Sequence, residues 1–212
     1  MVVELHEAAL AAGGRQLFSD LSFVARPGCR VAVTGGSDME RSFFLRVLLG
    51  MKSLDSGWMC LDGEPMPARL AAYFRQYISY MPRLLDFGDM SMADVAGFMR
   101  RGAGKGADTV EGNALRECLD MLGVPHDCMS RSLSGVDRSL AQRAVMALTF
   151  APRLPIALLD SPTLFQDELG RKTVADFLAS EWFDGSVIVV ATQDPALLAL
   201  ADETIDISAN NI

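Results

Sequence analysis

Short apolar runs and segments of helical periodicity alternate along this chain. Apolar runs predict strands at 31–34, 58–63, 77–81, 155–160 and 186–192. The last two contain continuous apolar runs, which are typical of strands covered on both faces of a parallel sheet. Helical spacing predicts helices at 41–50, 109–122, 138–150, 167–179 and 195–200, and Ser91 is the expected N-cap of another. The alternation indicates an α/β fold.

One domain is expected to span residues 1–212, since the chain is about one domain long. The helix-rich stretch from about 84 to 140 reads as an inserted lobe, with a glycine-rich loop at 102–108. Apolar residues make up 50% of the chain, which excludes a disordered protein. The net charge of −8 disfavours nucleic acid as the main partner, because phosphate binding needs a basic face.

Neither a membrane segment nor a histidine-based metal site is predicted. No run of 18 apolar residues occurs, and the first residues lack the basic and apolar regions of a signal peptide. The four cysteines are scattered without C-x-x-C spacing, as in a cytosolic protein with reduced thiols. The two histidines, His6 and His126, are too far apart along the chain for a histidine-based metal site.

A strand, a glycine turn and a helix follow one another at 31–50, in the layout of a phosphate-binding loop. Such a loop reads G-x-x-x-x-G-K-[ST], with glycines for close backbone approach, a lysine for the phosphates and a hydroxyl for Mg²⁺. This chain reads Gly35-Gly-Ser-Asp-Met-Glu-Arg-Ser42, so Glu40 replaces the second glycine and Arg41 the lysine. Taken alone, the segment also fits an ordinary strand-to-helix turn.

Five segments, in order and at family spacing, resemble the nucleotide-binding domains of ABC transporters. They are the approach to the loop at 21–35, Ile78-Ser-Tyr-Met-Pro-Arg83, Leu133-Ser-Gly-Val136, Leu158-Leu-Asp-Ser-Pro-Thr163, and Ala191-Thr-Gln-Asp-Pro-Ala196 followed by 200–205. The resemblance covers nearly the whole chain. It implies an ABC-type ATPase core with a mostly parallel sheet, an N-terminal antiparallel β portion and an inserted α-helical lobe.

The resemblance also implies a nucleotide site. It assigns contacts with ATP to Gly35, Gly36, Ser37, Arg41, Ser42 and Phe43, and Mg²⁺ to Ser42 and Asp160. Asp38 and Glu40 stand where the family usually has glycines, so two carboxylates would face the triphosphate. Alternatively they turn to solvent, or Arg41 pairs with one of them and closes the loop. The segment 10–14, where the family stacks adenine on an aromatic residue, has no ring.

Other departures fall on the family's working positions. Arg83 replaces the glutamine that senses Mg²⁺, and we expect it to be a surface or interface charge. Ser161 replaces the catalytic glutamate, which would remove general-base assistance of about 10²–10⁴-fold. Gln193 replaces the switch histidine, and Asp167 matches the aspartate of the D-loop.

The signature segment can be placed in two registers. Leu133-Ser134-Gly135 matches the start of the family's L-S-G-G, but Gln142-Arg143 then comes three residues late. Counting back from Gln142 without a gap places residues 136–139 there instead, and these match nothing. We favour the first register with a small insertion.

The resemblance therefore predicts a degenerate cassette that does not hydrolyse ATP, and whose binding of ATP and Mg²⁺ is weak. It would be the structural or regulatory half of a transporter, paired with permease subunits and a second nucleotide-binding domain. Ser134 and Gly135 could complete the partner's site. The chain would lie peripherally at the cytoplasmic face of the membrane, without inserting. The alternatives are an active ATPase with unusual residues, and a non-transport scaffold.

Overall fold

The computed structural model describes residues 1–84, 88–102 and 112–208. The expected glycine-rich loop lies, apart from its first residue, outside these ranges. No helix among the described residues is long and apolar enough to cross a membrane.

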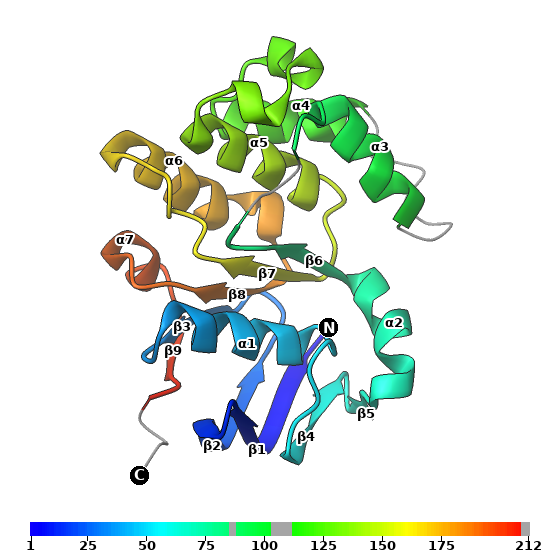
Figure 1. Cartoon of the computed structure of the whole chain (residues 1–212), viewed down its shortest axis with the longest axis vertical. Helices are drawn as coiled ribbons and strands as arrows, with labels where there is room; N and C mark the ends of the chain where they lie inside the picture. Colours follow the sequence, from blue (N-terminus) through cyan, green and yellow to red (C-terminus); the bar gives the residue numbers. More distant parts are fainter. Residues whose placement is uncertain (85–87, 103–111, 209–212) are drawn as a thin grey trace.

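A five-stranded parallel sheet forms the centre of the chain (Figure 1). Its order is β6 (Ile78–Met81), β7 (Ile156–Asp160), β8 (Val187–Ala191), β3 (Arg30–Thr34) and β9 (Glu203–Asp206). Every residue of β7 and β8 is buried, as expected for strands covered on both faces. All four predicted strands of this sheet are confirmed.

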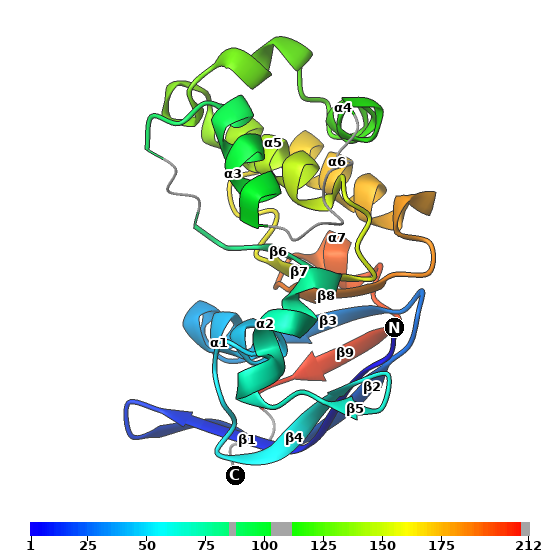
Figure 2. The ribbon, with the colours of Figure 1, turned by 90° about the vertical axis from the view of Figure 1, so that its right-hand side faces the viewer.

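A four-stranded antiparallel sheet lies beside the parallel one (Figure 2). It consists of β2 (Arg15–Ala25), β1 (Val3–Ala12), β4 (Ser56–Leu61) and β5 (Glu64–Pro65). The hairpin between β1 and β2 turns at Gly13 and Gly14, both at positive φ. The expected N-terminal antiparallel portion is thus confirmed.

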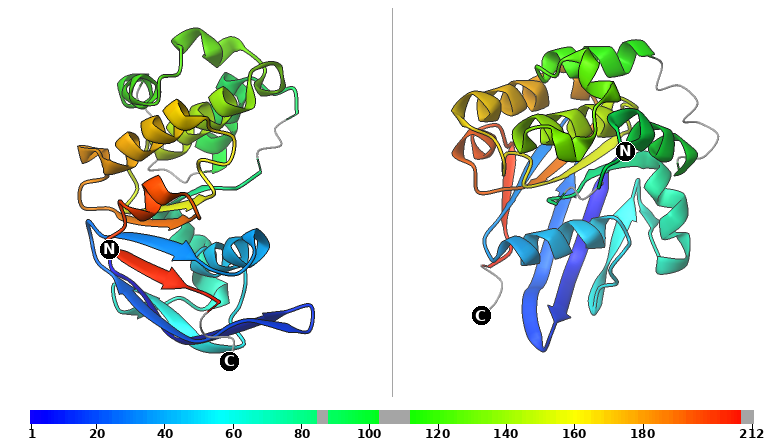
Figure 3. Two further views of the ribbon diagram at one scale, coloured as in Figure 1. Left: turned by 90° about the vertical axis from the view of Figure 1, so that its left-hand side faces the viewer. Right: turned by 45° about the horizontal axis from the view of Figure 1, so that its top comes forward.

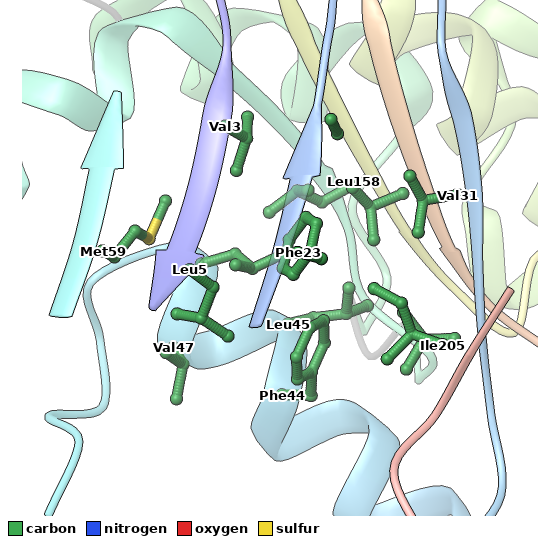
Figure 4. Close-up of a cluster of buried hydrophobic side chains, with 14 of the residues drawn as sticks. Val3, Leu5, Phe23, Val31, Phe44, Leu45, Val47, Met59, Leu158 and Ile205 are labelled. Atoms are coloured by element: carbon green, nitrogen blue, oxygen red, sulfur yellow. The ribbon is translucent and has the colours of Figure 1, made fainter. Parts of the chain in front are cut away.

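Helix α1 (Asp38–Leu48) fills the space between the two sheets. Its buried apolar side chains belong to one core cluster with both sheets, as Figure 4 shows for Phe44, Leu45 and Val47. The Phe44 ring lies edge-on to Phe18, with ring centres 5.7 Å apart. The helix begins three residues before its predicted start, because Ser37 and Glu40 form a capping box at 37–40.

The remaining helices cover the opposite face of the parallel sheet (Figure 3). They are α3 (Met92–Gly102), α4 (Gly112–Met121), α5 (Arg138–Phe150), α6 (Glu168–Ala179) and α7 (Pro195–Leu198), while the short α2 (Ala71–Phe74) precedes β6. The buried apolar side chains of α3 to α7 belong to a second core cluster, whereas Phe74 of α2 lies in the first. The strands belong to both clusters, since Leu158 lies in the first and its neighbours Ala157 and Leu159 in the second. The lobe boundary at about 84–140 stays a prediction.

Candidate functional site

The candidate site lies at the carboxyl ends of β3, β7 and β8, where parallel sheets commonly bind ligands. Strand β3 ends at Thr34, and the chain then passes through Gly35 and Gly36 into α1. Both glycines have positive φ, of 71° and 54°, which an L side chain rarely adopts. We call residues 35–42 the phosphate loop.

The carboxylate of Glu40 lies against the backbone of the phosphate loop. Its Oε2 accepts a hydrogen bond of 2.5 Å from the Ser37 N–H, and a Cβ placed on Gly36 would lie 2.7 Å from the same oxygen. The residue is 4% exposed, and Arg15 Nη2 lies 3.5 Å from its Oε1. The Ser37 N–H holds the pKa of this carboxyl below its ordinary value. Glu40 is therefore a buried anion on the loop.

Arg41 is folded back onto the same loop. Its Nη1 donates to the carbonyl oxygens of Gly35 (2.8 Å) and Gly36 (2.9 Å), and its Nη2 pairs with Asp38. The residue is only 2% exposed. This confirms the alternative in which Arg41 pairs with one of the two carboxylates.

Asp38 joins Arg41 to Arg83. The two arginines pair with its two carboxylate oxygens, Arg41 with Oδ1 and Arg83 with Oδ2. Arg83 comes two residues after the end of β6, so the interaction links the phosphate loop to the far edge strand of the sheet. Arg83 was predicted to be a surface or interface charge; its side chain is partly exposed, and its contact with the phosphate loop was not predicted.

Ser42 and Asp160 are brought together, as the resemblance implies for a metal-binding pair. The Ser42 hydroxyl donates to Asp160 Oδ2 at 2.5 Å, and the Ser161 hydroxyl donates to Oδ1 at 3.3 Å. Burial raises the pKa of Asp160, although both hydroxyls and the nearby Arg83 and Arg41 oppose the shift. Among the described residues, no group of three His, Cys, Asp or Glu could hold a metal ion.

Ser161 has a left-handed backbone, with φ of 51°, directly after β7. Its N–H donates to the Ala191 carbonyl (2.9 Å) and its carbonyl accepts from Gln142 Nε2 (3.2 Å). Gln142 is fully buried and also accepts from Gln166 Nε2 at 2.8 Å. Sequence reasoning used Gln142 only to set a register and missed this supporting role.

The other predicted positions lie around this centre. Gln193 follows β8 and is exposed, and Asp167 caps α6 by accepting from the Gly170 N–H at 2.8 Å. Phe43 is partly buried against the first core cluster, with the guanidinium of Arg46 5.5 Å from its ring centre.

The predicted signature segment forms a 3₁₀ turn, Leu133–Gly135, followed by α5. We call residues 132–137 the signature turn. The Ser134 hydroxyl donates to Asp89 Oδ1 at 2.8 Å. Asp137 is the N-cap of α5 and accepts from the N–H groups of Ser139 (2.9 Å) and Leu140 (3.4 Å). These N–H donors lower the pKa of Asp137, so an anion is already held at this helix start.

A nucleotide triphosphate does not fit this arrangement. Its phosphates would meet the carboxylates of Glu40 and Asp38, where the family has glycines. The loop also lacks a projecting ammonium, because Arg41 is committed to loop carbonyls and to Asp38.

Comparison with known proteins gives consistent similarity to ATP-binding cassettes, although no family model matches the chain. The cytochrome c biogenesis ATP-binding export protein CcmA of Nitrobacter hamburgensis is 29% identical over 200 residues, covering 92% of this chain and 93% of that protein. An ATP-dependent lipid A-core flippase of Xanthomonas axonopodis is 29% identical over 182 residues, covering 82% of this chain but 30% of the flippase.

Solved structures show the same fold. A putative ABC transporter ATP-binding protein from Pyrococcus furiosus superposes with a TM-score of 0.82 at 16% identity, covering all of both chains. An ATP-binding cassette dimer in a post-hydrolysis state, bound to ADP and Pi, gives 0.82 at 18% identity and covers 97% of this chain and 94% of that one. The chain therefore has the fold of an ABC-transporter ATP-binding cassette domain.

Proposed function

We propose that this chain is an ATP-binding cassette subunit of an ABC transporter that does not hydrolyse ATP and acts as its structural or regulatory half. Full-length similarity to a cassette protein and the cassette fold support the first part. The relatives are named for export, lipid flipping and iron import, so the proposal names the cassette role and no cargo.

The observation that carries the second part is the state of the phosphate loop. Glu40 lies on the loop backbone, and Asp38 pairs with both Arg41 and Arg83. Hydrolysis also needs a base for the attacking water. Position 161 is a serine, and its hydroxyl cannot replace a carboxylate as that base. Binding and chemistry are therefore both disfavoured.

The proposed partners are permease subunits and a second cassette, which places the chain peripherally at the cytoplasmic face of the membrane. A similar solved cassette is a dimer, which supports pairing of this kind. In this chain, however, the Ser134 hydroxyl is engaged by Asp89 and the start of α5 by Asp137. That Ser134 and Gly135 complete the partner's nucleotide site stays a prediction, and in that role the Ser134 hydroxyl would exchange Asp89 for the ligand.

The test is ATP turnover together with thermal stability in Mg-ATP. We expect no hydrolysis by the purified chain and no rise in Tm at millimolar Mg-ATP. Tm reports binding because a ligand that binds only the folded state raises it. A cooperative melting curve verifies that the protein is folded. Turnover above the no-enzyme background would contradict the proposal.

Ser161→Glu provides the informative variant and Ser161→Ala its matched control. The glutamate restores a carboxylate at the strand end but leaves the phosphate loop unchanged, so we expect both variants to stay inactive. If Ser161→Glu alone hydrolysed ATP, the loop would still bind nucleotide, and the missing carboxylate would be the only defect.

A further inference from the structure

Four charged side chains are concentrated at the phosphate loop, where Asp38 pairs with both arginines of the group and Glu40 is held by the Ser37 N–H and by Arg15. They are Asp38, Glu40, Arg41 and Arg83, two acids and two bases. Glu40 and Arg41 are almost fully buried, whereas most other ion pairs of the described residues are between exposed side chains. Burial of charge is costly unless each group is paired and hydrogen-bonded, so this cluster requires a specific explanation.

The two acids take the contacts that an anion would make. A loop that opens a helix binds anions through its backbone N–H groups. Here the Ser37 N–H donates to Glu40 Oε2, which also lies against Gly36. Asp38 presents one oxygen to each of the two arginines, as a bridging phosphate would.

We infer that the carboxylates of Glu40 and Asp38 are the resident anions of this loop, replacing a bound phosphate, so that the loop and the Arg83 segment are held in place without nucleotide. This inference deepens the proposed function and rests on it. The loop is then an anion site occupied by the chain's own carboxylates. Removal of the two carboxylates would allow a free phosphate compound to bind there.

The probe is inorganic pyrophosphate, which carries the charge of a nucleotide tail without its base or sugar. The variant Asp38→Asn/Glu40→Gln removes two negative charges and leaves Arg41 and Arg83 without a carboxylate partner among those described. We expect a lower Tm than wild type in buffer and recovery in pyrophosphate. At a concentration about a hundredfold above Kd, the rise should be about 5 °C or more for a chain of this size.

Asp127→Asn/Asp176→Asn is the matched control. It makes the same change in net charge at two exposed acids that pair with Arg131 and Lys172. Neither this control nor wild type should gain stability from pyrophosphate. If the control gained as much as the loop variant, the effect would be general electrostatics and the inference would be wrong.

Two further results would overturn the inference. One is pyrophosphate binding by wild type in calorimetric titration, because a filled loop has no place for it. The other is a folded loop variant that gains nothing from pyrophosphate. If the double variant does not fold in buffer, two measurements replace it. One is the rise in Tm of Glu40→Gln in pyrophosphate, and the other is refolding of the double variant in pyrophosphate. ATP turnover by wild type would instead reject the proposed function, so the two failures are distinguishable.

Discussion

The phosphate loop and the signature turn each hold acidic side chains on backbone N–H groups, but in different surroundings. Glu40 in the phosphate loop is almost completely buried, and two arginines share Asp38 beside it. Asp137 in the signature turn and Asp89 beside it are both exposed, and they accept from local N–H groups and from the Ser134 hydroxyl. The same kind of substitution should therefore change stability strongly in the first region and weakly in the second.

Loss of a buried arginine should give the largest effect. Arg41→Met removes the partner of two loop carbonyls and leaves Asp38 with Arg83 alone. We expect the free energy of unfolding to fall by about 2–4 kcal/mol, because buried groups lose their partners. Urea denaturation measures this change.

Arg131→Met is the matched substitution next to the signature turn. Arg131 pairs with Asp127, and its side chain is 58% exposed. Its removal should change the free energy of unfolding by no more than about 0.5 kcal/mol. Equal losses for the two variants would remove the distinction between the regions.

An intermediate effect should depend on pH. The lowered pKa of Glu40 means that its ionised form stabilises the folded state. This contribution is fully present above the ordinary glutamate pKa of about 4.3 and is lost as pH falls through the lower folded value. Glu40→Gln should therefore be less stable than wild type above that pH, and the two unfolding midpoints should converge in more acidic buffer. Parallel curves would show that the carboxylate is not held as an anion.

The smallest effect should come from the cap of α5. Asp137→Ala removes the acceptor of the Ser139 and Leu140 N–H groups. Amide hydrogen exchange at these two positions should quicken, while the free energy of unfolding falls by an amount at the low end for an N-cap, because the cap is at the surface. Unchanged exchange would show that the Asp137 carboxylate does not protect these two N–H groups.

The fold could be predicted from the sequence because its signals are local. The apolar runs at 155–160 and 186–192 indicated buried parallel strands, and the strands found there, β7 and β8, are fully buried. The order of the five motif segments then implied the architecture. The start of α1 was misplaced although its signal was present, since Ser37-x-x-Glu40 is a capping-box pattern.

The site was less accessible to sequence reasoning, because its decisive contacts join distant positions. Asp38 and Arg83 are 45 residues apart, and no local pattern indicates that they pair. Glu40 was interpreted as a carboxylate that faces a phosphate, turns to solvent or pairs with Arg41, although its cap spacing indicated a contact with Ser37. The sequence thus shows which groups have changed, but their new partners depend on tertiary structure.

The central sheet separates the two apolar clusters and contributes side chains to both. Along β7 and β8, side chains point alternately into the layer with α1 and into the layer with α5 and α6. A fragment carrying only one layer would leave a bare apolar face as large as the sheet itself, open to aggregation. We therefore expect neither half to fold stably as a separate fragment. A truncation that removes strands of the central sheet would destabilise both apolar clusters.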